Sequence, residues 1–360
     1  MRPTLPTTLP EFPIAAGAAL KTGAYDYISG GATDEWTLAE NVAAWRRLTI
    51  VPRVLTGSSG PDTRVTVLGK VQPHPLIAAP MAYQRIATGE GEIAMARAAA
   101  ATATIMCLST LSNVSASDVV AAVPNAQKWY QVYVFSDRAI TDRLIDEALS
   151  AGYEALVVTV DFPVSGIRER DLRSGFNVSS AVPSLADTGV ESGFEPHQAQ
   201  HATDAALSWK DVEAMAGRYQ VPVLVKGILT PDDALLAFAH GAAGIVVSNH
   251  GGRQLDGAPA TATVLAEIVD AVAGRGDVLV DGGIRRGTDV LRALALGANA
   301  VMIGRPLYWG LAVGGAAGAQ RVLELFLDEL RNALILCGAH AAQSLDRRFL
   351  GALIRPGSPG

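Results

Sequence analysis

Short runs of apolar residues recur along the chain from about residue 76, and a helix-like stretch follows each of them. Runs that are rich in Val and Ile and lack an alternating polar face are typical of strands in a parallel sheet that is covered on both faces. The pattern predicts eight such strands, at Leu76–Pro80, Thr104–Leu108, Trp129–Val134, Ala155–Val160, Val221–Lys226, Gly244–Ser248, Val278–Asp281 and Ala300–Gly304.

The segments between the strands are rich in Ala and Leu, as in EIAMARAAAATA, TDRLIDEALSAG, TPDDALLAFAHG and GTDVLRALALGA. Several open with Thr, Ser or Asp and close with Gly, as helices do at their caps. Eight strand–helix units predict the α/β class and a (β/α)8 TIM barrel. The alternative, a doubly wound sheet, needs a Gly-rich fingerprint after the first strand. That strand ends instead in APMAYQ.

We expect three parts along the chain. Residues 1–65 form an N-terminal extension with one helical stretch, DEWTLAENVAAWRRL, and residues 66–345 form the barrel. Residues 346–360 form a C-terminal tail. Within the barrel, residues 175–208 are polar and poor in large apolar side chains, which predicts a long loop after the fourth strand.

Composition narrows the class of protein. Hydrophobic residues make up 49% of the chain and charged residues 18%, as in a globular protein with a large core. The net charge is −6 and no basic tract stands out, which argues against a nucleic-acid partner. Cys107 and Cys337 lie far apart, without disulfide or metal-ligand spacing. The sequence has no secretory signal and no apolar run that could span a bilayer, so we expect a soluble, cytoplasmic protein without bound metal.

Polar residues gather where the later strands end. The active site of a TIM barrel is built at the carboxyl ends of its strands. Each of the last five predicted strands ends in, or runs directly into, a charged or titratable residue. These residues are Asp161, Lys226, His250 with Arg253, Asp281 with Arg285, and Arg305.

His250 is the best candidate for a catalytic base. An imidazole can take a proton near neutral pH, and the guanidinium of Arg253 can hold a carboxylate with two hydrogen bonds. Asp161 could orient the imidazole. For Lys226 the residues alone leave two roles open, a Schiff base or a charge partner for a cofactor. His250 has no second His or carboxylate at ligand spacing, so no metal site is predicted.

The two loops DGGIRRG and GRP predict a phosphate site. Small residues let backbone amides approach an anion, and the arginines neutralise it. The loops after the seventh and eighth strands are the usual phosphate site of this fold.

In SNHGGRQLDG (Ser248–Gly257) the sequence resembles the FMN-dependent alpha-hydroxy acid oxidase/dehydrogenase family, which includes glycolate, lactate and hydroxymandelate oxidases. The motifs VDGGIRRGTDV and ALGANAVMIGRP follow in the family's order, and the likeness runs from Tyr25 to about Gly310. The resemblance implies an (S)-2-hydroxy-acid oxidase that converts an L-2-hydroxy acid to the 2-oxo acid with FMN, passes electrons to O2 to give H2O2, and assembles as a homotetramer.

The resemblance also implies roles for individual residues. For catalysis they are His250, Asp161 and Tyr133, and for the substrate carboxylate they are Tyr27, Arg168 and Arg253. His250 would remove a proton from the hydroxyl or from the carbon. Lys226 matches the lysine near flavin N1, which favours the cofactor role. The other FMN contacts are Pro80, Met81, Ala82, Ser109, Gln131, Thr159, Ser248, Asp281, Gly283, Arg285, Gly304 and Arg305.

Three residues differ from those that the family usually carries at the same positions: Leu111, Ile167 before Arg168, and Met81. These differences leave the identity of the substrate open. The segment PMAYQR is similar to its counterpart in hydroxymandelate oxidase, which favours a bulky or aromatic acid. The alternatives are a dehydrogenase that uses a quinone or protein acceptor, a lactate 2-monooxygenase-like enzyme, and a flavin- or phosphate-binding barrel without turnover. The polar stretch after the fourth strand favours the soluble oxidase.

Overall fold

The computed structural model of the chain describes residues 5–351, except 177, 179–181 and 187–202. Eight parallel strands close into a barrel in the order β10-β3-β4-β5-β6-β7-β8-β9. The predicted TIM barrel is therefore confirmed, and each strand falls within or next to its predicted run. The strands are β3 (Leu76–Ala78), β4 (Ile105–Leu108), β5 (Lys128–Val132), β6 (Leu156–Thr159), β7 (Val223–Ile228), β8 (Gly244–Val247), β9 (Asp277–Val280) and β10 (Ala300–Ile303).

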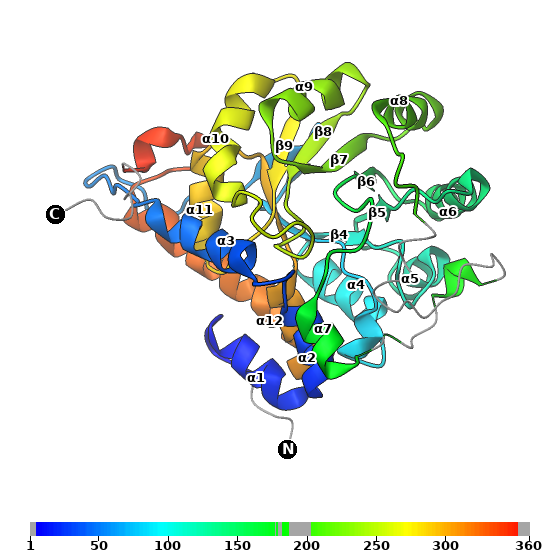
Figure 1. The fold of residues 1–360 in the computed structure, drawn as a ribbon. Helices are drawn as coiled ribbons and strands as arrows, with labels where there is room; N and C mark the ends of the chain where they lie inside the picture. Colours follow the sequence, from blue (N-terminus) through cyan, green and yellow to red (C-terminus); the bar gives the residue numbers. More distant parts are fainter. Residues whose placement is uncertain (1–4, 177, 179–181, 187–202, 352–360) are drawn as a thin grey trace.

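Helices surround the barrel, and most follow the strands as the capping pattern predicts (Figure 1). The Thr230 side chain accepts a hydrogen bond from the Asp233 amide at the start of α9, and Gly241 follows the same helix with φ of 85°. The helices are α4 (Glu92–Ala101), α5 (Ala116–Ala122), α6 (Arg138–Ser150), α7 (Glu169–Ser174), α8 (Trp209–Arg218), α9 (Pro231–Ala239), α10 (Thr261–Val272), α11 (Gly287–Ala295) and α12 (Arg305–Leu336).

The N-terminal extension holds three helices where the sequence predicted one. These are α1 (Glu11–Ala19), α2 (Thr22–Ser29) and α3 (Trp36–Arg47), and only α3 matches the predicted stretch. The first two are short, and α1 contains Pro and Gly, so neither shows a clear helical pattern in the sequence. They are held by packing against α12 and α7, and Figure 1 shows α2 beside α7. Phe12 is fully buried, which stabilises such an attachment by about 2–3 kcal/mol.

Trp45 joins α3 to the barrel rim. Its ring is fully buried, and its Nε1 donates to the Gly282 carbonyl after β9 at 2.8 Å. At the other end of the barrel the hairpin of β1 (Val65–Val67) and β2 (Lys70–Gln72) precedes β3. Its Leu68 amide donates to Asp277, at the start of β9. The proposed boundary between residues 65 and 66 stays a prediction.

The predicted long loop, residues 175–208, begins directly after α7 and contains a short 3-10 turn at Pro183–Leu185; residues 177, 179–181 and 187–202 of it lie outside the described residues. In the predicted tail, residues 346–360, Arg347–Phe349 form a 3-10 turn, and residues 352–360 lie outside the described residues. No helix in the described parts of the chain is both long and apolar enough to cross a membrane.

Candidate active site

One cavity opens at the carboxyl ends of the barrel strands, and it encloses about 1370 Å³ of empty space, including the part open to solvent. All predicted site residues line it except Asp161 and Ser248. They come from α2 and from the ends or following loops of all eight strands. The lining members are Tyr27, Pro80, Met81, Ala82, Ser109, Gln131, Tyr133, Thr159, Arg168, Lys226, His250, Arg253, Asp281, Gly283, Arg285, Gly304 and Arg305.

His250, Asp161 and Tyr133 form one hydrogen-bonded row. His250 Nδ1 lies 2.8 Å from Asp161 Oδ1, and His250 Nε2 lies 3.5 Å from the Tyr133 hydroxyl. An ionised carboxylate only accepts hydrogen bonds, so Nδ1 carries the proton that it shares with Asp161. The lone pair of the neutral imidazole is then on Nε2, which faces the cavity.

Electrostatic interactions keep His250 as a neutral imidazole and Asp161 as an ionised carboxylate. Desolvation lowers the pKa of His250 below its ordinary value, and the raising effect of Asp161 opposes this only in part. Burial alone would raise the pKa of Asp161, but Lys226 and His250 outweigh it and hold that pKa below the usual range. Burial likewise lowers the pKa of Lys226, and Asp161 with Asp281 more than restore it. His250 is thus ready to accept a proton at neutral pH.

The backbone at His250 is in the left-handed region, with φ of 56°. Such a conformation in a non-glycine residue costs about 1–3 kcal/mol and is concentrated at functional sites. Gly251 and Gly252 continue it with φ of 64° and 73°. A Cβ on Gly251 would come within 2.7 Å of Arg305 Nη1, so a larger residue there would have to displace the guanidinium that donates to the Gly251 carbonyl.

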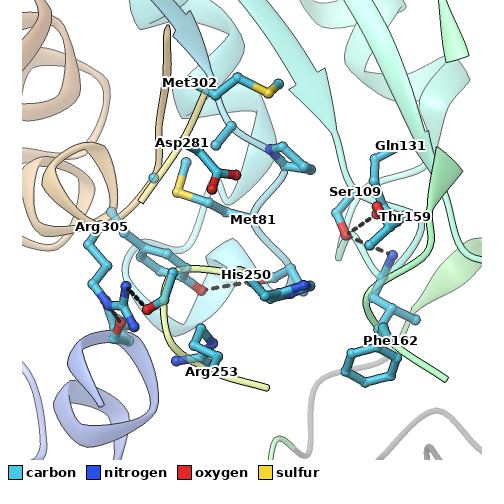
Figure 2. A pocket seen from close by; sticks show the side chains of 18 of the residues that line it. Met81, Ser109, Gln131, Thr159, Phe162, His250, Arg253, Asp281, Met302 and Arg305 are labelled. Atoms are coloured by element: carbon cyan, nitrogen blue, oxygen red, sulfur yellow. Dashed lines mark hydrogen bonds between the residues drawn. The ribbon is translucent and has the colours of Figure 1, made fainter. Parts of the chain in front are cut away.

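Arg253, Arg168 and Tyr27 form a second cluster in the same cavity. Arg253 Nη1 donates to the carbonyls of Tyr27 and Gly30 at 2.6 and 3.1 Å. The guanidinium carbons of Arg253 and Arg168 lie 5.0 and 6.0 Å from the centre of the Tyr27 ring. Figure 2 shows His250 and Arg253 close together on the same side of the cavity. A carboxylate held by the arginines would place its neighbouring carbon beside the imidazole.

A row of neutral polar groups stands across the cavity from His250 (Figure 2). The Ser109 hydroxyl and the Thr110 amide donate to Gln131 Oε1 at 3.2 and 3.1 Å, and Gln131 Nε2 donates to the Thr159 hydroxyl at 3.1 Å. These side chains are buried. They offer donors and acceptors to the edge of a planar polar ring without adding charge.

Lys226, in β7, supplies a buried cation to the wall of the cavity. Its Nζ donates to the Ser248 hydroxyl at 2.8 Å and lies 3.4 Å from Asp281 Oδ2 and 3.8 Å from Asp161 Oδ2. Ser248 is fully buried behind the lining, where its hydroxyl also accepts from the His250 amide at 3.1 Å. It therefore supports Lys226 and His250 in this structure, and its predicted contact with FMN stays a prediction.

The four arginines of the cavity have no ion-pair partner among the described residues. These arginines are Arg168, Arg253, Arg285 and Arg305. Arg305 instead donates to the carbonyls of Ile28, Gly251 and Gly30 at 2.7–3.2 Å. Burial lowers the pKa of Arg168 and Arg285 to about 10, so both remain cations at neutral pH. Half-buried cations without an anionic partner leave positive charge in the wall, and the cavity is therefore suited to bind anions.

Residues 16–352 match the FMN-dependent dehydrogenase family. The chain belongs to that family. It is 46% identical to the peroxisomal (S)-2-hydroxy-acid oxidase of Oryza sativa subsp. japonica, covering 96% of each chain. It is 45% identical to the L-lactate oxidase of Nostoc sp., covering 96% of this chain and 98% of the relative. It is 42% identical to the human 2-hydroxyacid oxidase 1, covering 93% and 94%.

Solved structures of this FMN-dependent dehydrogenase family share the fold. Mandelate oxidase with (S)-4-hydroxymandelic acid superposes with a TM-score of 0.89 at 39% identity, covering 96% of this chain and 98% of that one. A soluble mutant of the membrane-associated (S)-mandelate dehydrogenase of Pseudomonas putida gives a TM-score of 0.89 at 34% identity, covering 96% and 99%.

The residues of the cavity fit FMN. The Asp281 Oδ1 atom is buried without a hydrogen-bond partner among the described residues, as expected of a group that awaits a ligand hydroxyl. Arg285 and the N-terminus of α12, where Arg305 begins the helix, lie at the end of the cavity that carries the DGGIRRG and GRP loops. Lys226 and the Ser109–Gln131–Thr159 row would flank the ring.

Sequence reasoning missed several residues of the cavity. Phe162 stacks at a tilt on Tyr133 and His250, with centroids 4.9 and 5.9 Å away. The Tyr308 hydroxyl donates to the carbonyls of Ala82 and Tyr83 at 2.9 and 2.7 Å, which fixes the loop after β3. Phe162 directly follows Asp161, and that adjacency was the available signal. Tyr308 lies inside a helix, and no local signal marked it.

Proposed function

We propose that this chain is an (S)-2-hydroxy-acid oxidase, which converts an L-2-hydroxy acid to the 2-oxo acid with FMN as the cofactor and O2 as the electron acceptor. The observation that carries the proposal is one arrangement. His250, whose unprotonated Nε2 can accept a proton, shares a cavity with two arginines that have no anionic partner among the described residues. The family match and the named oxidases among the relatives support the same conclusion.

The residues divide the work by the group of the substrate that they would hold. Arg253 and Arg168 bind the carboxylate, with the Tyr27 ring beneath both guanidinium groups. Tyr133 donates to the substrate hydroxyl. His250 Nε2 removes a proton, and Asp161 stabilises the imidazolium that forms. Holding both reacting groups in one geometry removes much of the entropic part of the barrier.

FMN, when bound, would accept the two electrons that leave the alpha carbon and deliver them to O2 as H2O2. Asp281, Gly283, Arg285, Gly304 and Arg305 would hold its ribityl chain and phosphate. Lys226 would place a cation beside the ring and favour negative charge there. Pro80, Met81 and Ala82 would pack beside the reacting edge.

We also propose that the enzyme is cytoplasmic and forms a homotetramer. Two buried cysteines, Cys107 and Cys337, are free thiols, which suits a reducing compartment. Some relatives are named as peroxisomal, so localisation of a tagged chain in its own cells is the direct test. The tetramer rests on the family resemblance, and light scattering on the purified protein measures it.

The function is tested by mixing the purified yellow protein with 2-hydroxy acids without oxygen. We expect at least one acid to bleach the flavin absorbance. His250→Ala should lower the rate of bleaching by about 10²–10⁴-fold, because the proton acceptor is lost, while FMN stays bound. His240→Ala is the matched control, since that histidine lies outside the cavity and contacts Glu213. Rapid bleaching of His250→Ala would contradict the assigned base.

The acceptor is tested by adding oxygen to the bleached protein. An oxidase recovers its absorbance at once and releases H2O2 with the 2-oxo acid. Recovery only with a quinone would identify a dehydrogenase, and a decarboxylated acid in place of peroxide would identify a monooxygenase. A protein that remains yellow with every acid would be a flavin-binding barrel without turnover.

A further inference from the structure

A second cavity lies beside the active-site cavity. It encloses about 990 Å³ of empty space, including the part open to solvent. Tyr133, Thr159 and Phe162 line both cavities, so these three residues belong to the wall between them. His250 lines the active-site cavity but not the second one. The separation of His250 from the second cavity therefore depends on this wall.

The two sides of the wall suit different contents. Asp204, Ser208 and Asp233 contribute polar groups to the second cavity. A hollow that is roomy and offers several polar partners holds water. The active-site side needs the opposite condition, because a buried pair such as His250 and Asp161 interacts more strongly where water is excluded.

Phe162 is the apolar member of the wall, and its ring touches both groups that would handle the substrate hydroxyl. The residue is buried, with 9% of its surface exposed. The centre of its ring lies 4.9 Å from that of Tyr133 and 5.9 Å from that of the His250 imidazole. The ring planes are tilted by 43° and 38°, a favourable geometry for aromatic pairs.

Hydrogen bonds alone do not fix the plane of the imidazole. His250 Nδ1 is held by Asp161 at 2.8 Å, but Nε2 lies 3.5 Å from the Tyr133 hydroxyl, which is long for a hydrogen bond. One good hydrogen bond holds a single atom of the ring and leaves the ring able to turn about that bond. The Phe162 ring packs against the imidazole and opposes this rotation.

We propose that Phe162 is a positioning residue, whose ring holds His250 and Tyr133 in place and keeps the water of the second cavity away from the proton-accepting Nε2 atom. This inference rests on the proposed function and deepens it by naming the residue that shields its base. A small side chain at position 162 would join the two cavities. Water would then compete with the substrate for Nε2, and the imidazole would be free to turn.

Entry of water should also change the titration of His250. Desolvation is the largest influence on the pKa of this residue and lowers it, so water beside the imidazole should raise that pKa. Asp161 raises the pKa of His250, while Lys226 and Arg168 lower it. Burial raises the pKa of Tyr133, so this phenol stays neutral. Substitution of Phe162 leaves all these groups in the chain, as it does the other charged residues of the cavity, Arg253, Asp281, Arg285 and Arg305.

The test uses the full chain with bound FMN and a series that shortens the side chain in steps, Phe162→Leu, Phe162→Val and Phe162→Ala. Phe238→Ala is the control, since Phe238 is a half-buried residue of α9 that lines neither cavity. The rate of flavin bleaching without oxygen is measured against the concentration of L-lactate, glycolate or (S)-mandelate, whichever bleaches the wild type. The limiting rate and the half-saturating concentration are determined in a pH series at constant ionic strength. FMN content and the unfolding temperature are measured on the same samples.

We expect the limiting rate of Phe162→Ala to fall by about 10–100-fold while FMN stays bound, because the reacting groups are no longer held in one geometry. The midpoint of the acid limb should move to higher pH in the order Leu, Val, Ala, as more water reaches His250. Phe238→Ala should unfold at a lower temperature and keep the rate and the midpoint of the wild type. If Phe162→Ala loses FMN or does not fold, the comparison of Phe162→Leu with Phe162→Val decides the question.

Two results would overturn the inference while leaving the function intact. One is a limiting rate that stays within twofold of the wild type across the whole series. The other is a rate that falls without any movement of the acid midpoint, because the second cavity would then bring no water to His250. If none of the acids bleaches the wild type, the proposed function fails and the inference fails with it.

Discussion

The hydrogen bond between Asp161 and His250 allows a quantitative prediction. Asp161→Asn keeps the shape of the side chain but removes the charge that lies 2.8 Å from His250 Nδ1. Two unit charges about 4 Å apart, in an effective dielectric of about 20, interact by about 4 kcal/mol. That energy favours the imidazolium formed when His250 takes the proton, and it corresponds to about three orders of magnitude in rate.

The asparagine amide can still accept a hydrogen bond, so part of this energy remains. We expect kcat/KM of Asp161→Asn to fall by about 10²–10⁴-fold. The assay is the anaerobic rate of flavin bleaching at several acid concentrations, with FMN content measured from the absorption spectrum. FMN should remain bound, because Asp161 does not line the cavity. The acid limb of the pH profile should also move to lower pH, since Asp161 raises the pKa of His250.

Asp277→Asn provides the matched control for this experiment. Asp277 is a partly buried carboxylate that accepts from the Leu68 amide at the opposite end of the barrel. Its replacement should lower stability and leave the bleaching rate unchanged. An Asp161→Asn enzyme within tenfold of the wild type, with an unshifted pH profile, would refute the role given to this carboxylate.

Two further predictions concern the same pair. Burial lowers the pKa of His250, so kcat/KM should hold as pH falls to the ordinary histidine value of about 6.5 and decline only below it; a midpoint at or above 6.5 in a constant-ionic-strength pH series contradicts this. Gly227 has φ of 117° in a bulge of β7, and a Cβ there would come within 2.6 Å of the Asp161 Cβ. Gly227→Ala should displace Asp161 and lower kcat/KM by about 10–100-fold, whereas Gly217→Ala in α8, where a Cβ meets nothing within 4 Å, should not. Equal activity of the two variants would show that the bulge does not position Asp161.

The barrel was predictable because its strands are buried on both faces. A run such as Val223–Val225 has no polar residue at any position, and this pattern survives without knowledge of the tertiary structure. The charged residues at the strand ends were predictable for a related reason. The topology of a parallel barrel brings every carboxyl end to one rim, so Asp161 and His250 meet although 89 positions separate them.

Other features depend on contacts that no local pattern records. The hydroxyl of Ser248 accepts a hydrogen bond from Lys226 and does not line the cavity, and the sequence predicted where Ser248 lies but not which group it contacts. The helices α1 and α2 owe their stability to packing against α12 and α7. Gly227 matters through the carboxylate of a residue that follows the neighbouring strand β6. Each of these requires coordinates.

The carbonyls at the end of α2 have a consequence for how the enzyme comes into being. Tyr27 and Gly30 receive Arg253, and Ile28 and Gly30 receive Arg305. The segment that ends at residue 30 is therefore synthesised more than two hundred residues before the arginines that donate to its carbonyls. We expect a nascent chain to have no turnover until Arg253 and Arg305 are present. A protease cut before residue 31 that released α2 should likewise abolish turnover although the barrel itself is intact. The two arginines thus couple the integrity of the N-terminal helices to the geometry of the cavity.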